Sequence, residues 1–247
     1  MKPLLLLLLL FILLSACENK QEENTSEPET ATLEVKYSGA LKQIMHEGDL
    51  SAKADLKDLK NLDHLYAIGA LEGLKGEIQI IDGQSYVTYV DSTSHLAFDP
   101  SFEKRAAIIV YAQVENWMKF SIPAEVVTKD ELENYIAQTA GENNINIHQP
   151  FPFMLDGNIA FIDWHVINWQ DGDMEHTHEK HIQSGLHGTL IGEDARMIGF
   201  YSDAHHGVFT HHTTNMHIHV KTKDNMVAGH VDDLELGKVT TLLLPKI

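Results

Sequence analysis

The spacing of hydrophobic residues changes several times along the chain, and each spacing predicts a type of secondary structure. Apolar residues recur at helical spacing over residues 37–47 and Gly48 follows them, so we expect a short helix that ends at this glycine. Short runs rich in Ile, Val and Tyr, either alternating with polar residues or continuously apolar, are typical of strands. Such runs predict strands at residues 65–68, 77–81, 86–90, 106–112 and 117–122.

The residues between these runs predict how two pairs of strands are joined. The dipeptide Asp82-Gly83 lies in the short loop between residues 77–81 and 86–90, which predicts a hairpin. Residues 117–122 alternate between apolar and polar positions shortly after the run at 106–112, and we expect these two strands to pair.

The second half of the chain opens with a predicted helix. Thr128 is a suitable helix cap and Glu131 stands three residues later as its partner in a capping box, so we expect a helix that reaches about Ala140. From Ile145 onward we expect short strands and turns, with a last strand at residues 240–244. The whole pattern predicts an α+β fold with mixed or antiparallel β-sheets and a few flanking helices.

The first sixteen residues are typical of an export signal. Leu4 to Leu14 is an unbroken apolar run behind the positive charge of Lys2, and it is half as long as the ~20 residues that span a bilayer. The run ends in Leu14-Ser15-Ala16-Cys17, which resembles a bacterial lipobox and indicates lipidation of Cys17. We therefore expect an exported, membrane-anchored lipoprotein that faces the periplasm or the cell surface; a plain secretory signal is the alternative reading.

The rest of the N-terminal region indicates which cysteine chemistry to expect and where the folded domain begins. Cys17 is the only cysteine, so an internal disulfide, cysteine-ligated zinc and a catalytic thiol are all disfavoured. Residues 18–32 contain five Glu and no aromatic or large aliphatic residue, which is typical of a flexible tether. We expect a signal peptide over residues 1–16, the lipidated cysteine and its acidic tether over 17–32, and one folded domain over 33–247.

The formal net charge of −18 restricts the partners. A surface this acidic repels nucleic acid and anionic lipid headgroups, so we expect no nucleic-acid partner and membrane contact only through the N-terminal lipid. A small molecule is the expected ligand, and a homodimer is compatible with the sequence.

Histidines carry the strongest chemical signal. Twelve of the sixteen lie between His165 and His230. His217 and His219 alternate along a predicted strand and therefore point to the same face. Turn residues follow, so a hairpin would return His230 to the same place. Three neutral imidazoles leave a fourth metal position open, which is typical of catalytic zinc, and we expect one zinc ion per chain; ordinary core or surface histidines are the alternative.

Two further groups of polar residues have more than one interpretation. Asp232 and Asp233 can orient a ligand imidazole or can be solvated carboxylates in a turn. The remaining histidines can form a second metal site, a metal-scavenging loop or a rim around the first site. The members of this group are His176, His178, His181, His205, His206, His211 and His212.

Over about residues 35–245 the chain resembles the α-acetolactate decarboxylase family. The strongest match is the pattern H-x-H, ten residues of which the last is Gly229, then His230, which supplies the three zinc ligands in that family. A second match runs from Gly69 to Glu77, where the family carries an active-site Glu, and a third, weaker match covers residues 188–192 and 199–201. The resemblance implies a two-lobed fold of β-sheets with flanking helices, and decarboxylation of acetolactate, a 2-hydroxy-3-oxo acid, to acetoin and CO2.

The resemblance also assigns roles and marks departures. It implies that Glu77 handles a proton or supports a zinc-bound water. The family's active-site Arg is replaced here by His165, and we hypothesise that His165 takes over as proton donor. The family's Thr after Gly69 is Ala70, and many members have a C-terminal tail with a further Glu where this sequence ends at Ile247. Two alternatives stay open: a related metalloenzyme that enolises or hydrolyses another substrate, and a His-rich lipoprotein that buffers zinc.

Overall fold

The computed structural model describes residues 33–247, which form one compact unit. The expected signal peptide, Cys17 and the tether lie outside the described residues. Within the described part, no helix combines the length and apolar character needed to cross a membrane.

The first half of the domain forms an eight-stranded antiparallel sheet with strand order β1-β8-β3-β4-β6-β7, in which β2 pairs with β8 and β5 with β4. The helix α1 (Leu41–Glu47) and the 3-10 turns η1 (Leu56–Leu59) and η2 (Glu72–Leu74) connect these strands. The strands are β1 (Val35–Ser38), β2 (Ala54–Asp55), β3 (Leu65–Leu71), β4 (Glu77–Ile81), β5 (Gln84–Ser85), β6 (Val87–Val90), β7 (Leu96–Asp99) and β8 (Arg105–Gln113).

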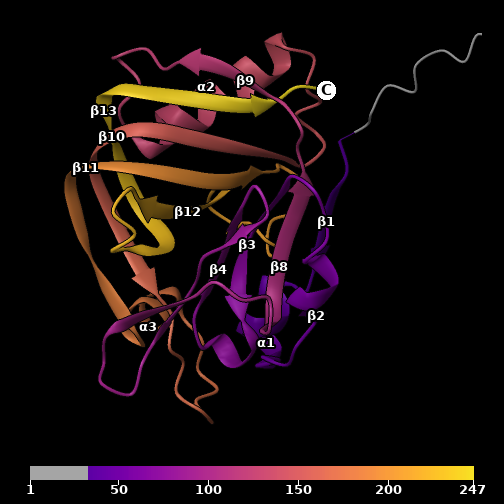
Figure 1. Cartoon of the computed structure of the whole chain (residues 1–247), viewed down its shortest axis with the longest axis vertical. Coiled ribbons are helices and arrows are strands. Elements are labelled where there is room, and N and C mark those ends of the chain that lie inside the picture. Colours follow the sequence, from indigo (N-terminus) through magenta and orange to yellow (C-terminus); the bar gives the residue numbers. More distant parts are fainter. Residues whose placement is uncertain (1–32) are drawn as a thin grey trace, which may run out of the picture. The chain divides into compact units, whose positions relative to one another are not determined.

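The second half forms a five-stranded antiparallel sheet with strand order β10-β11-β12-β13-β9 (Figure 1). Because β10 also pairs with β13, the strands β10, β11, β12 and β13 form a closed ring of paired strands. Helices α2 (Lys129–Glu142) and α3 (His178–Gln183) accompany this sheet. Its strands are β9 (Trp117–Ser121), β10 (Phe151–Val166), β11 (Leu186–Tyr201), β12 (Met216–Thr222) and β13 (Ala228–Pro245).

These elements confirm the predicted strand-rich α+β fold, with two antiparallel sheets in place of a mixed arrangement. The Asp82-Gly83 hairpin forms, and both residues have the positive φ that such a turn requires. The capping box at the start of α2 also forms, with Thr128 accepting from the Glu131 N–H and Glu131 accepting from the Thr128 N–H.

Three expectations from the sequence are wrong in part. The helix predicted over 37–47 begins only at Leu41, because the residues before it form β1 and pair with β8. The strand at 117–122 does not pair with its predecessor; β9 pairs with the end of β13 in the other sheet. The strands after Ile145 are long, since β10, β11 and β13 contain 16, 16 and 18 residues.

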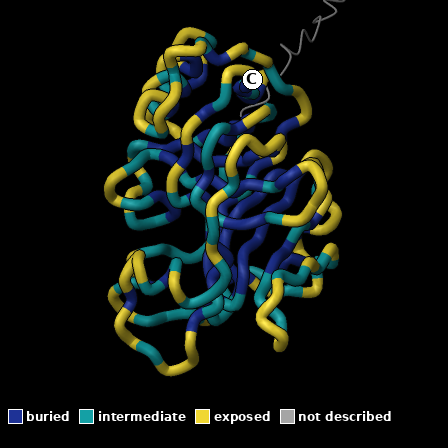
Figure 2. The backbone as a smooth tube through the Cα atoms, turned by 90° about the vertical axis from the view of Figure 1, so that its left-hand side faces the viewer, coloured by how far each residue is buried: buried dark blue, intermediate teal, exposed yellow. Residues whose placement is uncertain are grey.

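Two of the three hydrophobic clusters determine where the functional site lies. One cluster packs α2 against the five-stranded sheet through residues such as Leu132 and Ile136. Another joins the two sheets, with Ile198 and Phe200 of β11 packing in one cluster with Ile108 of β8. Figure 2 shows the buried strands along the middle of the domain and the exposed residues in its loops. The contact between the sheets brings β4 and β8 close to β10, β12 and β13.

A candidate metal centre between the two sheets

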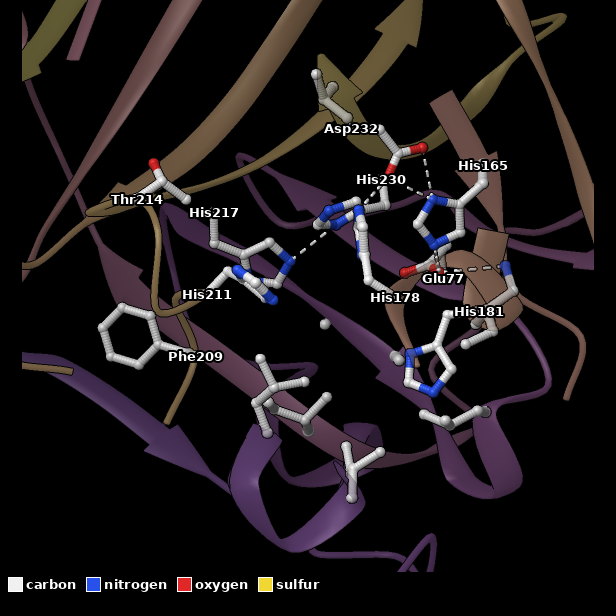
Figure 3. A pocket seen from close by; sticks show the side chains of 18 of the residues that line it. Glu77, His165, His178, His181, Phe209, His211, Thr214, His217, His230 and Asp232 are labelled. Carbon is white, nitrogen blue, oxygen red and sulfur yellow. Dashed lines mark hydrogen bonds and ion pairs between the residues drawn. The ribbon is translucent and has the colours of Figure 1, made fainter. Parts of the chain in front are cut away.

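Strand register places four histidines side by side across three strands of the five-stranded sheet. In β13, His230 pairs with His219 of β12 on one side and with His165 of β10 on the other. His217 lies two residues before His219 on the same strand, so the two share a face. The turn between β12 and β13 contains Asn225 with positive φ. The predicted hairpin is confirmed, and it brings together the three histidines expected to hold a metal. Figure 3 shows two of them, His217 and His230.

The ring nitrogens of these three histidines have the spacing that a tetrahedral metal requires. His217 Nε2 lies 3.2 Å from His230 Nδ1 and 3.2 Å from His219 Nε2. Zinc–nitrogen bonds of about 2.0–2.1 Å at tetrahedral angles give nitrogen pairs about 3.3–3.4 Å apart. Each of the three residues offers one nitrogen within 4.8 Å of the other two. The donor set therefore fits a zinc-sized divalent ion without rearrangement.

Burial keeps these imidazoles in the neutral form that binds metal. The side chain of His219 is completely buried, and burial holds the pKa values of His219 and His230 well below the usual value for histidine. Burial, followed by the charge of Lys129, lowers the pKa of His217 to about 4. A neutral imidazole has a free lone pair on one nitrogen, so protons do not compete with a metal here near neutral pH.

A bulge in β13 arranges the neighbouring acid and base. The register between β10 and β13 shifts from Asp163–Asp233 to Trp164–Val231, which leaves Asp232 as the extra residue. Its two carboxylate oxygens lie 2.9 and 2.8 Å from His165 Nδ1. Asp232 therefore orients His165, which differs from both interpretations offered by the sequence, a carboxylate that orients a metal ligand and a solvated carboxylate in a turn. The other predicted carboxylate, Asp233, accepts the N–H of Leu234.

Glu77 reaches the same place from the other sheet. It begins β4, is 4 % exposed, and accepts a hydrogen bond from the Ile167 N–H. One of its oxygens lies 4.0 Å from His165 Nε2 and the other 3.7 Å from His219 Nε2. Burial raises the pKa of Glu77 to about 7, although the charge of His165 and the Ile167 N–H act in the opposite direction. Burial lowers the pKa of His165, but the hydrogen bond with Asp232 and the charge of Glu77 outweigh it, so that pKa is raised.

These residues form one wall of a cavity of about 240 Å³ between the sheets. This volume is close to the lower end of the ~300–1,000 Å³ typical of ligand pockets, so the cavity suits a small molecule. The polar wall contains Glu77, His165, His217, His230 and Asp232, and the apolar wall contains Leu41, Ile44, Met45, Leu74, Ile108 and Phe209.

The other histidines occupy several different environments. His178, His181 and His211 line the cavity, so these three form the rim that was one of the expected alternatives. His176 stacks on Trp169, with ring centroids 4.3 Å apart. Within residues 33–247, the three histidines of the β12–β13 hairpin are the only group with the spacing of a metal site.

Sequence reasoning missed Lys129, the first residue of α2, which also lines the cavity. The sequence indicated only that Lys129 follows the cap of a predicted helix, and nothing in it pointed to a cavity. The apolar wall was also missed, because it is assembled from α1, η2, β8 and a loop that are remote in sequence.

Comparison with known proteins found a matching family and solved structures of similar fold. The sequence model of a family described as alpha-acetolactate decarboxylase matches residues 37–244. The crystal structure of alpha-acetolactate decarboxylase from Bacillus subtilis strain 168 matches with a TM-score of 0.68 and 15 % identity, over 86 % of each chain. A Staphylococcus aureus protein of unknown function, similar to alpha-acetolactate decarboxylase, matches with a TM-score of 0.67 and 17 % identity, over 86 % of this chain and 85 % of that one. No curated protein matches the chain. At these identities the solved structures establish a shared fold.

Proposed function

Since the chain belongs to the alpha-acetolactate decarboxylase family, we propose that it is a metal-dependent carboxy-lyase that converts acetolactate, a 2-hydroxy-3-oxo acid, to acetoin and CO2. The observation that carries this proposal is that His217, His219 and His230 offer three closely spaced ring nitrogens beside a cavity that suits a small molecule, with His217 and His230 in its wall. Neutral imidazoles with an open fourth position are the donor set of catalytic zinc, so we propose zinc, with one ion per chain.

The three histidines of the hairpin would hold the ion. When bound there, a divalent ion supplies a Lewis acid for the oxygen atoms of the substrate. The strands fix the imidazoles beforehand, because His217 and His219 are two residues apart on β12 and His230 is paired with His219 across the sheet. Pre-organisation of this kind avoids a loss of conformational entropy when the ion and the substrate bind.

Glu77 and His165 supply the proton. Departure of CO2 leaves its bonding electron pair on the carbon that carried the carboxylate, and a proton must reach that carbon to give acetoin. A pKa of about 7 allows Glu77 to hold a proton on a carboxylate oxygen and release it near neutral pH. His165 Nε2 lies 4.0 Å from that carboxylate. In the resemblance to the family, His165 stands at the position of the Arg, where it would supply a group that can exchange protons.

Asp232 keeps His165 in the required orientation. With its Nδ1–H donated to the Asp232 carboxylate, His165 directs Nε2 towards Glu77, where it can take up a proton and return it. The apolar wall across the cavity limits the access of water, which would otherwise compete with Glu77 as the proton source.

A direct assay tests the proposal. Zinc-loaded protein is incubated with racemic acetolactate, and acetoin is measured by gas chromatography on a chiral column. We expect acetoin from the loaded protein, and only the non-enzymatic background from chelator-treated protein and from a His219→Ala variant. Equal acetoin in all three samples would contradict the proposal.

The metal content separates this enzyme from a zinc buffer. Elemental analysis after dialysis should give one tightly held zinc per chain and none in His219→Ala. Several weakly held ions that persist in the variant would favour the buffering alternative, in which the dispersed histidines bind zinc.

We also propose that the protein is an exported lipoprotein held at a membrane through Cys17. The support is the apolar run of residues 4–14 followed by a lipobox-like sequence. Mass spectrometry of the mature N-terminus should find a diacylated Cys17, and a Cys17→Ser variant should leave the membrane fraction. An unmodified cysteine, or an uncleaved N-terminus, would contradict the anchor.

A further inference from the structure

The position of Lys129 is fixed by the same strand that carries His230. Its Nζ donates a hydrogen bond to the main-chain oxygen of Asp232 at 2.8 Å. The segment in front of α2 is docked on β13 as well, through the bridge between Thr128 and Glu235 and the hydrogen bond from the Leu236 N–H to the Val127 oxygen. The ammonium group is therefore held at the wall of the cavity, two residues along β13 from a proposed metal ligand.

Lys129 is the only Lys or Arg among the residues that line the cavity. Within residues 33–247, no carboxylate oxygen lies within salt-bridge distance of its Nζ. An ammonium group has three donor hydrogens, and the oxygen of Asp232 accepts one of them. A partly buried cation with unused donors, facing a cavity, is a binding group for an anion.

The other charges along the wall determine where an anion would lie. Glu77 and Asp232 are the only Asp or Glu residues among those that line the cavity, and they repel a carboxylate. Lys129, His217 and His230 all line this one cavity. A substrate that reaches the imidazoles can therefore extend a carboxylate towards Lys129.

We propose that Lys129 binds the substrate carboxylate, the group that leaves as CO2, and so selects acids over the corresponding neutral compounds. This inference rests on the proposed function, because that function supplies an acid as the substrate. Lys129 would act by position and charge: it holds the carboxylate at one end of the cavity while the carbon next to it faces Glu77 and His165.

The test compares a carboxylate ligand with its neutral counterpart. The carboxylate probe is 2,3-dihydroxy-2-methylbutanoate, in which the ketone is reduced so that CO2 is not lost; the neutral probe is butane-2,3-diol. Their affinities for the zinc-loaded protein are measured by calorimetry. In Lys129→Met we expect the carboxylate probe to bind about 10- to 100-fold more weakly, as charge-assisted hydrogen bonds are lost, with unchanged binding of the diol.

Folding is not at risk in this variant. Methionine is about as good a helix former as lysine, and a positive charge in the first turn opposes the helix dipole, so its removal leaves α2 intact. Lys129→Arg keeps the charge and should restore most of the affinity for the carboxylate. Lys119→Met removes an exposed lysine from β9 and serves as the matched control, with unchanged affinity for both probes.

Each outcome decides the inference. If wild-type protein binds the carboxylate and Lys129→Met binds it equally well, Lys129 has no such role, and the proposed decarboxylase function still stands. If Lys129→Met binds both probes more weakly by the same factor, Lys129 has a structural role and does not recognise the carboxylate. If zinc-loaded wild-type protein fails to bind the carboxylate probe, the proposed function and the inference fail together.

Discussion

Replacement of Gly229 by alanine tests how closely the crossing of β10 and β13 fixes His230. A Cβ at this position would lie 2.5 Å from the main-chain oxygen of His165 and 3.1 Å from a methyl carbon of Val166. Ordinary van der Waals contact begins at 3.4 Å, so β13 and β10 must separate locally by 0.9 Å (3.4 minus 2.5). Ligand distances in real metal sites vary by only about 0.2 Å. The displacement of the adjacent His230 is therefore several times what the site tolerates.

The expected effects of Gly229→Ala follow from this displacement. We expect the affinity for zinc to fall at least about 10- to 100-fold, the range measured when support around metal ligands is lost. The free energy of unfolding of the metal-free protein should fall by about 1–3 kcal/mol, which is typical of an overpacked position. For a domain of this length each kcal/mol lowers Tm by about 2–4 °C.

The matched control is Gly141→Ala on α2. A Cβ there meets no atom within 4 Å, and alanine is favoured over glycine in a helix by about 1 kcal/mol. Its zinc affinity should equal that of the wild type and its Tm should be slightly higher. Zinc affinity is measured by competition with a chromophoric chelator, and Tm by circular dichroism with and without zinc. Wild-type zinc affinity in Gly229→Ala would refute the reasoning from strand geometry.

Three further predictions concern the proton donor and the support of the site. Glu77→Gln keeps the shape of the side chain but cannot carry a proton, so acetoin formation should fall by about 10²- to 10⁴-fold while elemental analysis still finds one zinc; an active variant would exclude Glu77 as the proton source. His165→Ala should lose activity to a similar extent, and full turnover would remove His165 from the mechanism. Glu133→Ala removes the acceptor for the main-chain and side-chain N–H groups of Asn215, just before β12. It should lower the free energy of unfolding by about 1–3 kcal/mol, measured by thermal unfolding. Glu142→Ala, which loses one exposed hydrogen bond, should unfold within 1–2 °C of the wild type, and equal Tm values for both would contradict this role.

The metal ligands could be predicted because their geometry is local. His217 and His219 share a face of one strand by the period of two, and the turn before His230 returns the chain to the neighbouring strand. The capping box of α2 and the hairpin at Asp82-Gly83 were predictable for the same reason, since each depends on residues a few positions apart.

What the sequence did not reveal depends on distant pairings. The alternation in β9 identified a strand, but its partner is the end of β13, more than a hundred residues later, and alternation carries no information about the partner. The contact of Asp232 with His165 depends on the bulge in β13, and no turn residue marks a bulge of this kind. Lys129 looks like a surface residue until α2 is docked on β13.

Anomalous diffraction at the zinc absorption edge, from crystals of the zinc-loaded protein, tests the metal centre most directly. We expect one strong peak, about 2.0–2.1 Å from a ring nitrogen of each of His217, His219 and His230. A peak bound by other histidines, or no peak within bonding distance of these three rings, would contradict the account.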